Sequence, residues 1–466
     1  MITSQRMETL HRFLAALPDG VAVRLAQAVE YDWLTGGAGL PHDAILESLR
    51  PALRRASGMR RVPSALRWFC RPFEDLLVGA RTGPKAKGRI ARCSIRPVWR
   101  WLATILLCDE TESYLSGMKE AATRGREDDA MVRAARFWPL AAQALARGLA
   151  EPEAARAVLG GDDIAADAKE MALLLSVAAE ITALQARFPK PLPSLDEGSL
   201  RMLRDAYDRL IAAAPDAAPY IAVIAMNRLA KPWEALRLPL MVARQSDDTL
   251  ISSTDMGLAG ELLLAEMDAH ALAIRTARPP RFDADDLARH VARFAQLSTG
   301  IAAEVEIRRG GRWSQRLLSD RAAVGDVMAD HVRRGARDIL AALPTIKSGA
   351  YAGGPRVPDL GRRFDSERAE GAVNAARLIA GCRASAAGAC FGAALADADE
   401  ETAIGLKSYT DELVRELRAT EGERRGIAEQ YFALAILLTG ILFSTEEAAF
   451  LQRRGRAAVA SASQAA

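Results

Sequence analysis

Apolar residues recur every three or four positions through most of this 466-residue chain, which is the spacing of amphipathic α-helices. Alternating runs rich in Val, Ile, Thr and Tyr, which would indicate strands, do not recur along it. In residues 304–316, however, Val305 and Ile307 precede Gly310 and Gly311. We favour a helix, a Gly-Gly loop and then a long helix over 314–343, with at most a minor β-hairpin near 304–316. The pattern predicts an all-α fold of several domains, built from helical hairpins and bundles.

The composition is typical of close-packed helices in a folded, soluble protein. Half of the residues are apolar but only 6% are aromatic, so the cores must consist mainly of Ala, Leu, Val and Ile. The longest apolar run covers residues 431–443, thirteen residues, whereas a membrane-spanning helix needs about 20. We therefore expect a buried core helix at this run and no transmembrane segment.

Stretches rich in Gly and Pro at 188–199, 276–286 and 344–366 divide the chain. The sequence predicts an N-terminal helical domain over 1–190, a middle helical domain over 195–343 and a C-terminal helical bundle over 367–455. Residues 344–366 are expected to form a linker or loop, and residues 456–466 a disordered tail. Small residues crowd 370–395, so we expect that the C-terminal bundle can self-associate.

No residue pattern with a known catalytic, cofactor-binding or metal-binding geometry is present. The five cysteines include no C-x-x-C pair, and no two of the five histidines have the i, i+4 spacing of metal ligands on a helix. Acidic doublets such as Asp162-Asp163 and Asp247-Asp248 stand at predicted helix starts, where carboxylates cap free N–H groups. We therefore assign no catalytic residue, cofactor or metal. A non-enzymatic protein is favoured, with an enzyme whose site assembles only in three dimensions kept open.

The cysteine count also bears on the compartment of the protein. An odd number of cysteines, with no secretory signal in residues 1–20, predicts a reducing cytoplasm. Only eight of the 62 basic residues are lysine, which together with abundant alanine is typical of a GC-rich bacterial genome. Abundant arginine by itself is therefore no sign of nucleic-acid binding.

Residues 50–101 form the strongest anomaly in the sequence. This segment holds twelve arginines and two lysines against Glu74 and Asp75, a net charge of +12, while the rest of the chain carries −9. Genome bias does not explain why acidic residues avoid this stretch. A helix over 89–106 would place several of the arginines on one stripe, although Pro97 is expected to interrupt it. The candidate binding surface consists of Arg67, Arg71, Arg89, Arg92, Arg96 and Arg100.

Two interpretations of this basic segment stay open. In one, its tryptophans belong to a core and its arginines pair with the acidic residues that follow Cys108. In the other, the arginines face an external partner, which could be a protein, a nucleic acid or an anionic membrane surface. We favour a helical adaptor or scaffold that acts through protein–protein contacts, with a nucleic-acid-binding protein as the alternative.

Overall fold

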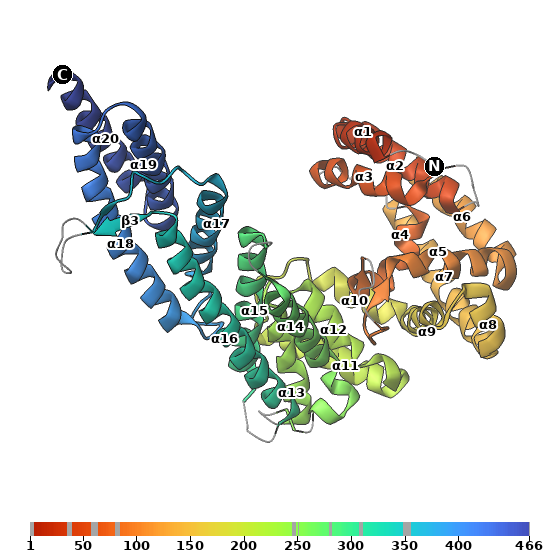
Figure 1. Cartoon of the computed structure of the whole chain (residues 1–466). Helices are drawn as coiled ribbons and strands as arrows, with labels where there is room; N and C mark the ends of the chain where they lie inside the picture. Colours follow the sequence, from red (N-terminus) through yellow and green to blue (C-terminus); the bar gives the residue numbers. More distant parts are fainter. Residues whose placement is uncertain are drawn as a thin grey trace. The chain divides into compact units, whose positions relative to one another are not determined.

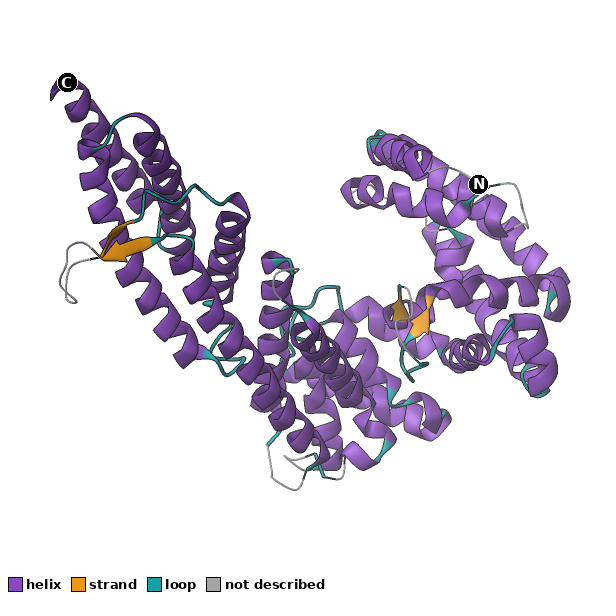
Figure 2. Cartoon of the chain, viewed as in Figure 1, coloured by secondary structure: helices purple, strands orange, loops and turns teal. Residues whose placement is uncertain are grey.

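The computed structural model describes residues 4–34, 40–56, 64–79, 84–244, 248–249, 251–278, 282–306, 311–347 and 356–465. About 80% of the chain is helical, which confirms the all-α prediction (Figure 2). Two small two-stranded sheets occur in the described ranges, and neither lies at 304–316. There α15 ends at Glu304 and α16 begins at Arg312, so the two helices of the helix–loop–helix interpretation are confirmed, while residues 307–310, where the loop was expected, lie outside the described part.

The contacts divide the chain into two compact units. Unit 1 comprises Met1–Ala243 and Thr254–Ala259, and unit 2 comprises Arg244–Ser253 and Gly260–Ala466. The segments 188–199 and 344–366, expected from the sequence to separate domains, each lie inside one unit. The division into three domains stays a prediction.

Unit 1 is built from short helices in a continuous succession. Its α-helices are α1 (Ser4–Ala15), α2 (Asp19–Leu34), α3 (His42–Arg55), α4 (Ala65–Cys70), α5 (Arg92–Trp101), α6 (Cys108–Thr123), α7 (Glu127–Gly148), α8 (Pro152–Leu159), α9 (Asp162–Ser176), α10 (Ala178–Arg187), α11 (Glu197–Ala213), α12 (Tyr220–Arg228) and α13 (Arg237–Ala243). Strands β1 (Leu77–Val78) and β2 (Ile90–Ala91) pair in parallel. Figure 1 shows this succession from red to light green.

Two cores hold the first half of unit 1 together. Helices α1, α2 and α3 pack around Leu14, Ala26 and Leu49, all of which are buried. Farther along, aromatic rings from α4 to α7 pack edge to face or stack, with Phe69 and Trp99 separated by 5.1 Å between centroids. Five aromatic residues of the 50–101 segment are buried, namely Trp68, Phe69, Phe73, Trp99 and Trp101. The tryptophans of the basic segment are therefore core residues, as one of the two interpretations requires.

Unit 2 is a bundle of long helices. It contains α14 (Leu258–Thr276, from Gly260 onward), α15 (Ala284–Glu304), α16 (Arg312–Ala341), α17 (Ser366–Cys382), α18 (Gly392–Ala419), α19 (Gly422–Leu442) and α20 (Thr445–Ala465). Helix α16 packs against α17 and α18, α17 also packs against α15 and α19, and α18 packs against α19 and α20 (Figure 1). Helix α19 contains the apolar run 431–443 except its last residue, Phe443. Among the described helices it is long and apolar enough to cross a membrane, and 44% of its most apolar 18-residue stretch is buried in the bundle.

Two C-terminal segments differ from the sequence-based expectation. Strands β3 (Thr345–Lys347) and β4 (Arg356–Pro358) form an antiparallel pair within the expected linker, and β4 packs on α18. Leu360 is buried just after this pair, so the described part of 344–366 is attached to the bundle. Helix α20 continues to Ala465 where a disordered tail was expected over 456–466, and Ala458 within this stretch is fully buried.

Candidate functional site

Helix α5 turns one face to the core and the other to solvent. Its inward residues are Ser94, Ile95, Val98, Trp99 and Trp101, all buried. Arg92, Arg96 and Arg100 recur every four residues along the opposite face, and all three are exposed. A four-residue step along a helix is about 6 Å, so these three residues, here called the arginine row, extend over about 12 Å.

The structure corrects two expectations about the arginine stripe predicted for a helix over 89–106: where the stripe starts, and that Pro97 interrupts it. Helix α5 begins at Arg92, after strand β2, so Arg89 lies outside the helix and outside the row. Pro97 lies within α5 and does not end it. A proline removes one helical hydrogen bond but leaves the four-residue spacing of the flanking positions, so the row is continuous across Pro97.

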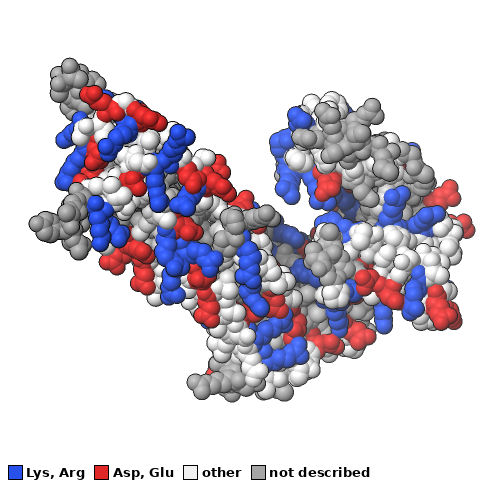
Figure 3. All heavy atoms as spheres, in the orientation of Figure 1, with Lys and Arg blue, Asp and Glu red and all other residues white. Residues whose placement is uncertain are grey.

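Within the described ranges, no carboxylate lies within ion-pair distance of any member of the arginine row or of Arg67 on α4, which is also exposed. The Arg96 guanidinium instead lies 5.9 Å from the ring centre of Trp33, and that of Arg71 lies 4.8 Å from the ring centre of Trp68. The acidic residues after Cys108 therefore do not neutralise the row. Figure 3 shows basic side chains exposed over the region of α4 and α5, whereas blue and red alternate along α16 and α18.

Several other members of the basic segment have partners inside unit 1, whereas Arg54 is exposed and forms no ion pair with a described residue. Arg89 is half-buried and donates to the amide oxygen of Asn227 at 3.4 Å. Lys87 pairs with Asp255 at 2.9 Å, where both side chains are well exposed. Arg55 pairs with Asp19 at 3.6 Å and Arg50 with Glu47 at 3.9 Å. Residues 57–63 and 80–83, which include Arg60, Arg61 and Arg81, lie outside the described part.

Lys85 is the centre of a buried polar network. Its ammonium lies 2.9 Å from Asp167 and 2.6 Å from Glu170, both on α9. Asp167 also accepts a hydrogen bond from the Ser94 hydroxyl at 2.5 Å, and Glu170 accepts one from the Tyr220 hydroxyl at 2.8 Å. Burial, reinforced by the adjacent Glu170 carboxylate, raises the pKa of Tyr220. We call these five residues the Lys85 network; it attaches the chain before α5 to α9 and α12.

The two acidic residues of the basic segment do not neutralise the row either. Asp75 is buried and accepts from the Arg228 guanidinium at 3.0 Å and from the Gln185 amide at 3.1 Å, both from later helices. The nearby Glu74 has a raised pKa, chiefly because of burial and then because of Asp75. The positive charge of the arginine row is therefore left for solvent or for a partner.

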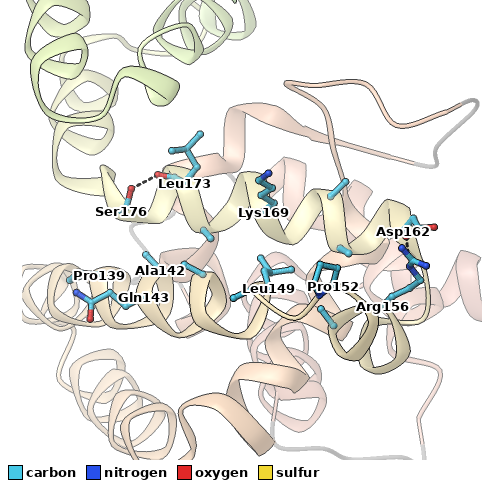
Figure 4. Close-up of a pocket in the computed structure, with 16 residues that line it drawn as sticks. Pro139, Ala142, Gln143, Leu149, Pro152, Arg156, Asp162, Lys169, Leu173 and Ser176 are labelled. Carbon is cyan, nitrogen blue, oxygen red and sulfur yellow. Dashed lines mark hydrogen bonds and ion pairs between the residues drawn. The ribbon is translucent and has the colours of Figure 1, made fainter.

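Sequence reasoning did not find a groove between α7, α8 and α9. It has a volume of about 720 Å³, and Figure 4 shows Gln143 and Ser176 at one end and the Arg156–Asp162 ion pair at the other, with Lys169 between them. Its apolar lining is mostly small or aliphatic: Pro139, Ala142, Ala146, Leu149, Ala150, Pro152, Ala155, Ala165, Ala166, Ala172 and Leu173. Alanines spaced for one helical face in both α7 and α9 are the sequence signal for such a groove.

The titratable groups that could suggest an enzyme are placed as follows. His270 of α14 and His290 of α15 meet with their Nδ1 atoms 2.8 Å apart, and burial together with His290 lowers the pKa of His270. The described residues contain no group of three or more His, Cys, Asp or Glu side chains that could hold a metal ion. Asp162 and Asp163 lie in the first turn of α9, and buried Asp248 accepts the Trp313 backbone N–H of α16 at 2.7 Å. The predicted local capping is not observed at these doublets: α9 has no side-chain cap hydrogen bond, and Asp248 acts on α16, far along the chain, while Asp247 lies outside the described part.

No protein-family model matches the chain, and neither a curated protein nor a solved structure is detectably similar to it.

Proposed function

We propose that this protein is a non-enzymatic helical adaptor, and that its arginine row binds an acidic segment of a protein partner. The observation that carries the proposal is the exposure of Arg92, Arg96 and Arg100 without carboxylate partners, while Lys85 and Lys87 in the same segment are neutralised internally. Exposed guanidinium groups in a row can form charge-assisted hydrogen bonds with carboxylates at matching spacing.

The surroundings of the row favour a protein over a nucleic acid. Arg96 lies over Trp33, and Arg and Trp together are enriched where proteins bind proteins. Ile105, 59% exposed, follows α5 and adds apolar surface beyond Arg100. A row of three arginines could neutralise about three phosphates, so nucleic-acid binding through it would have a shallow salt dependence, with a logarithmic slope of about −3.

The proposal includes a cytoplasmic location. All five cysteines are free, and three of them, Cys93, Cys108 and Cys390, are exposed. Exposed free thiols are compatible with a reducing compartment.

The test uses the full chain and a fluorescent amphipathic peptide with glutamates on one helical face and leucines on the other. Replacing Arg92, Arg96 and Arg100 together with Ala should weaken binding by about 1–3 kcal/mol, which is about fivefold to 150-fold in Kd, because three exposed ion pairs are lost. The matched control replaces three other exposed arginines of unit 1 that have no ion pair among the described residues, Arg136, Arg147 and Arg187. This control should leave the affinity almost unchanged.

Competition distinguishes the classes of partner. A short DNA duplex or a vesicle containing phosphatidylserine should not displace the peptide. Displacement by DNA, with loss of DNA binding in the triple Arg variant, would favour the nucleic-acid alternative. Equal effects of the row variant and the control variant on peptide binding would refute the proposal.

A further inference from the structure

A second groove lies in unit 2, between α17 and α19. It has a volume of about 710 Å³. Ala369 and Leu434 are buried in it, while Ala433 and Leu437 are exposed along α19, Leu437 to 49%. Apolar side chains that remain exposed along a groove between two packed helices form a surface suited to another helix.

The charges on the rim of this groove have both signs. Glu370 and Arg377 on α17 are exposed, and neither forms an ion pair with a described residue. They are seven residues apart, which is about two helical turns or about 10 Å, so both lie on the same side of α17. Val373 and Asn374 lie midway between them and also line the groove.

This arrangement is self-complementary under a two-fold axis. If α17 meets a second α17 in antiparallel orientation with the axis next to Val373, Glu370 faces the partner's Arg377, and Arg377 faces the partner's Glu370. A uniformly acidic peptide would meet Glu370, and a uniformly basic peptide would meet Arg377, so either would leave one like-charge contact. Only an occupant with the reversed order of the two charges satisfies both, and a second copy of the chain has that order.

We propose that the α17–α19 groove is a two-fold interface in which α17 of each copy lies between α17 and α19 of the other. Leu437 and Ala433 supply the apolar contact, and Glu370 with Arg377 sets the antiparallel register. The four helices then form an antiparallel layer of the kind found in helical bundles. This surface belongs to unit 2, so the inference does not depend on the arginine row of unit 1.

Charge reversal provides the decisive experiment, with analytical ultracentrifugation of the full chain over a range of concentrations. The unmodified protein should dimerise, and Glu370→Arg alone or Arg377→Glu alone should raise the dimer Kd at least tenfold, because each change creates two like-charge contacts. An equimolar mixture of the two variants should regain dimers. In the mixed dimer both arginines of the Glu370→Arg copy face both glutamates of the Arg377→Glu copy, so opposite charges meet at each end of the interface. Leu437→Asp should also prevent dimerisation.

Matched controls are Glu401→Arg and Arg418→Glu on α18, where both residues are exposed and have no ion pair among the described residues. These variants carry the same changes in charge and should dimerise like the unmodified protein. Circular dichroism of each variant should show native helix content, which separates loss of the interface from loss of the fold. A protein that stays monomeric at the highest concentration, or single variants that dimerise as well as the unmodified chain, would overturn the proposal.

Discussion

Two lysines of the basic segment offer a matched comparison of buried and exposed ion pairs. Lys85 and Lys87 are two positions apart, yet the Lys85 side chain is 13% exposed and pairs with Asp167 and Glu170, whose side chains are 0% and 10% exposed. The side chains of Lys87 and its partner Asp255 are 47% and 71% exposed. We expect these two lysines to contribute very differently to the stability of unit 1.

Replacing each lysine in turn with methionine, which retains an apolar stem, removes only the charge and its hydrogen bonds. Lys85→Met leaves two buried carboxylates without their cation, and the loss of one partner from a buried ion pair costs about 3–5 kcal/mol. Lys87→Met should cost about 0–1 kcal/mol, because water solvates the remaining carboxylate. Adding Asp167→Asn and Glu170→Gln to Lys85→Met should recover part of the loss, because the uncompensated charges are then removed.

Urea unfolding followed by tryptophan fluorescence measures these differences. Six of the seven tryptophans lie in unit 1, and Trp313 lies in unit 2, so the signal reports mainly on the unit that contains Lys85. The reasoning is refuted if Lys85→Met and Lys87→Met lower the free energy of unfolding by the same amount, or if Lys85→Met costs less than about 1 kcal/mol.

Three further measurements test the structure elsewhere. Burial raises the pKa of the Cys382 thiol to about 12 and also raises that of Cys70. A thiol reagent should therefore label the native protein quickly at the three exposed cysteines and reach all five only after unfolding. Fast labelling of all five in the native protein would contradict the burial of Cys70 and Cys382. Burial and the facing Asp268 carboxyl raise the pKa of Asp320 to about 6. The stabilisation of the fold that comes from protonated Asp320 should therefore be complete below pH ~4 and be lost as the pH rises through 6. Thermal unfolding of Asp320→Asn should lack this pH dependence, and a variant with the same pH profile as the unmodified protein would contradict the prediction. Asp248→Ala removes the acceptor of the Trp313 N–H in the first turn of α16 and should lower the free energy of unfolding of unit 2 by about 1–2 kcal/mol. Urea titrations followed by circular dichroism measure this change, and no change would show that the cap is dispensable.

The fold class was predictable because it depends on local periodicity. The helix expected over 314–343 is observed as α16, Arg312–Ala341, because the apolar spacing of that stretch is continuous. Its start was misplaced by two residues, since the Trp313 N–H in its first turn donates to Asp248, more than sixty positions earlier in the chain. A cap supplied from a distant segment leaves no signal next to the helix that it caps.

The contacts that sequence reasoning missed have the same origin. His270 and His290 lie twenty positions apart, outside the i, i+4 spacing used to search for paired histidines, and they meet only because α14 and α15 place them face to face. The α7–α9 groove likewise depends on how two helices pack. Helix periodicity shows which face of a helix is buried, but it does not show which other helix covers that face.

The excess positive charge of residues 50–101 comes from two groups of side chains, those paired inside the protein and those exposed, and the sequence alone cannot separate them. Lys85 is neutralised by carboxylates of α9, and because those partners lie about eighty positions later, a local count of charge leaves them out. Asp75 is likewise committed to Arg228, about one hundred and fifty positions later, and so provides no counter-charge for α5. A local net charge therefore mixes internal pairing with exposed surface. Once the internal partners are assigned, the positive charge that α5 offers to a partner is that of Arg92, Arg96 and Arg100, and this is why the binding test changes these three residues and leaves the lysines in place.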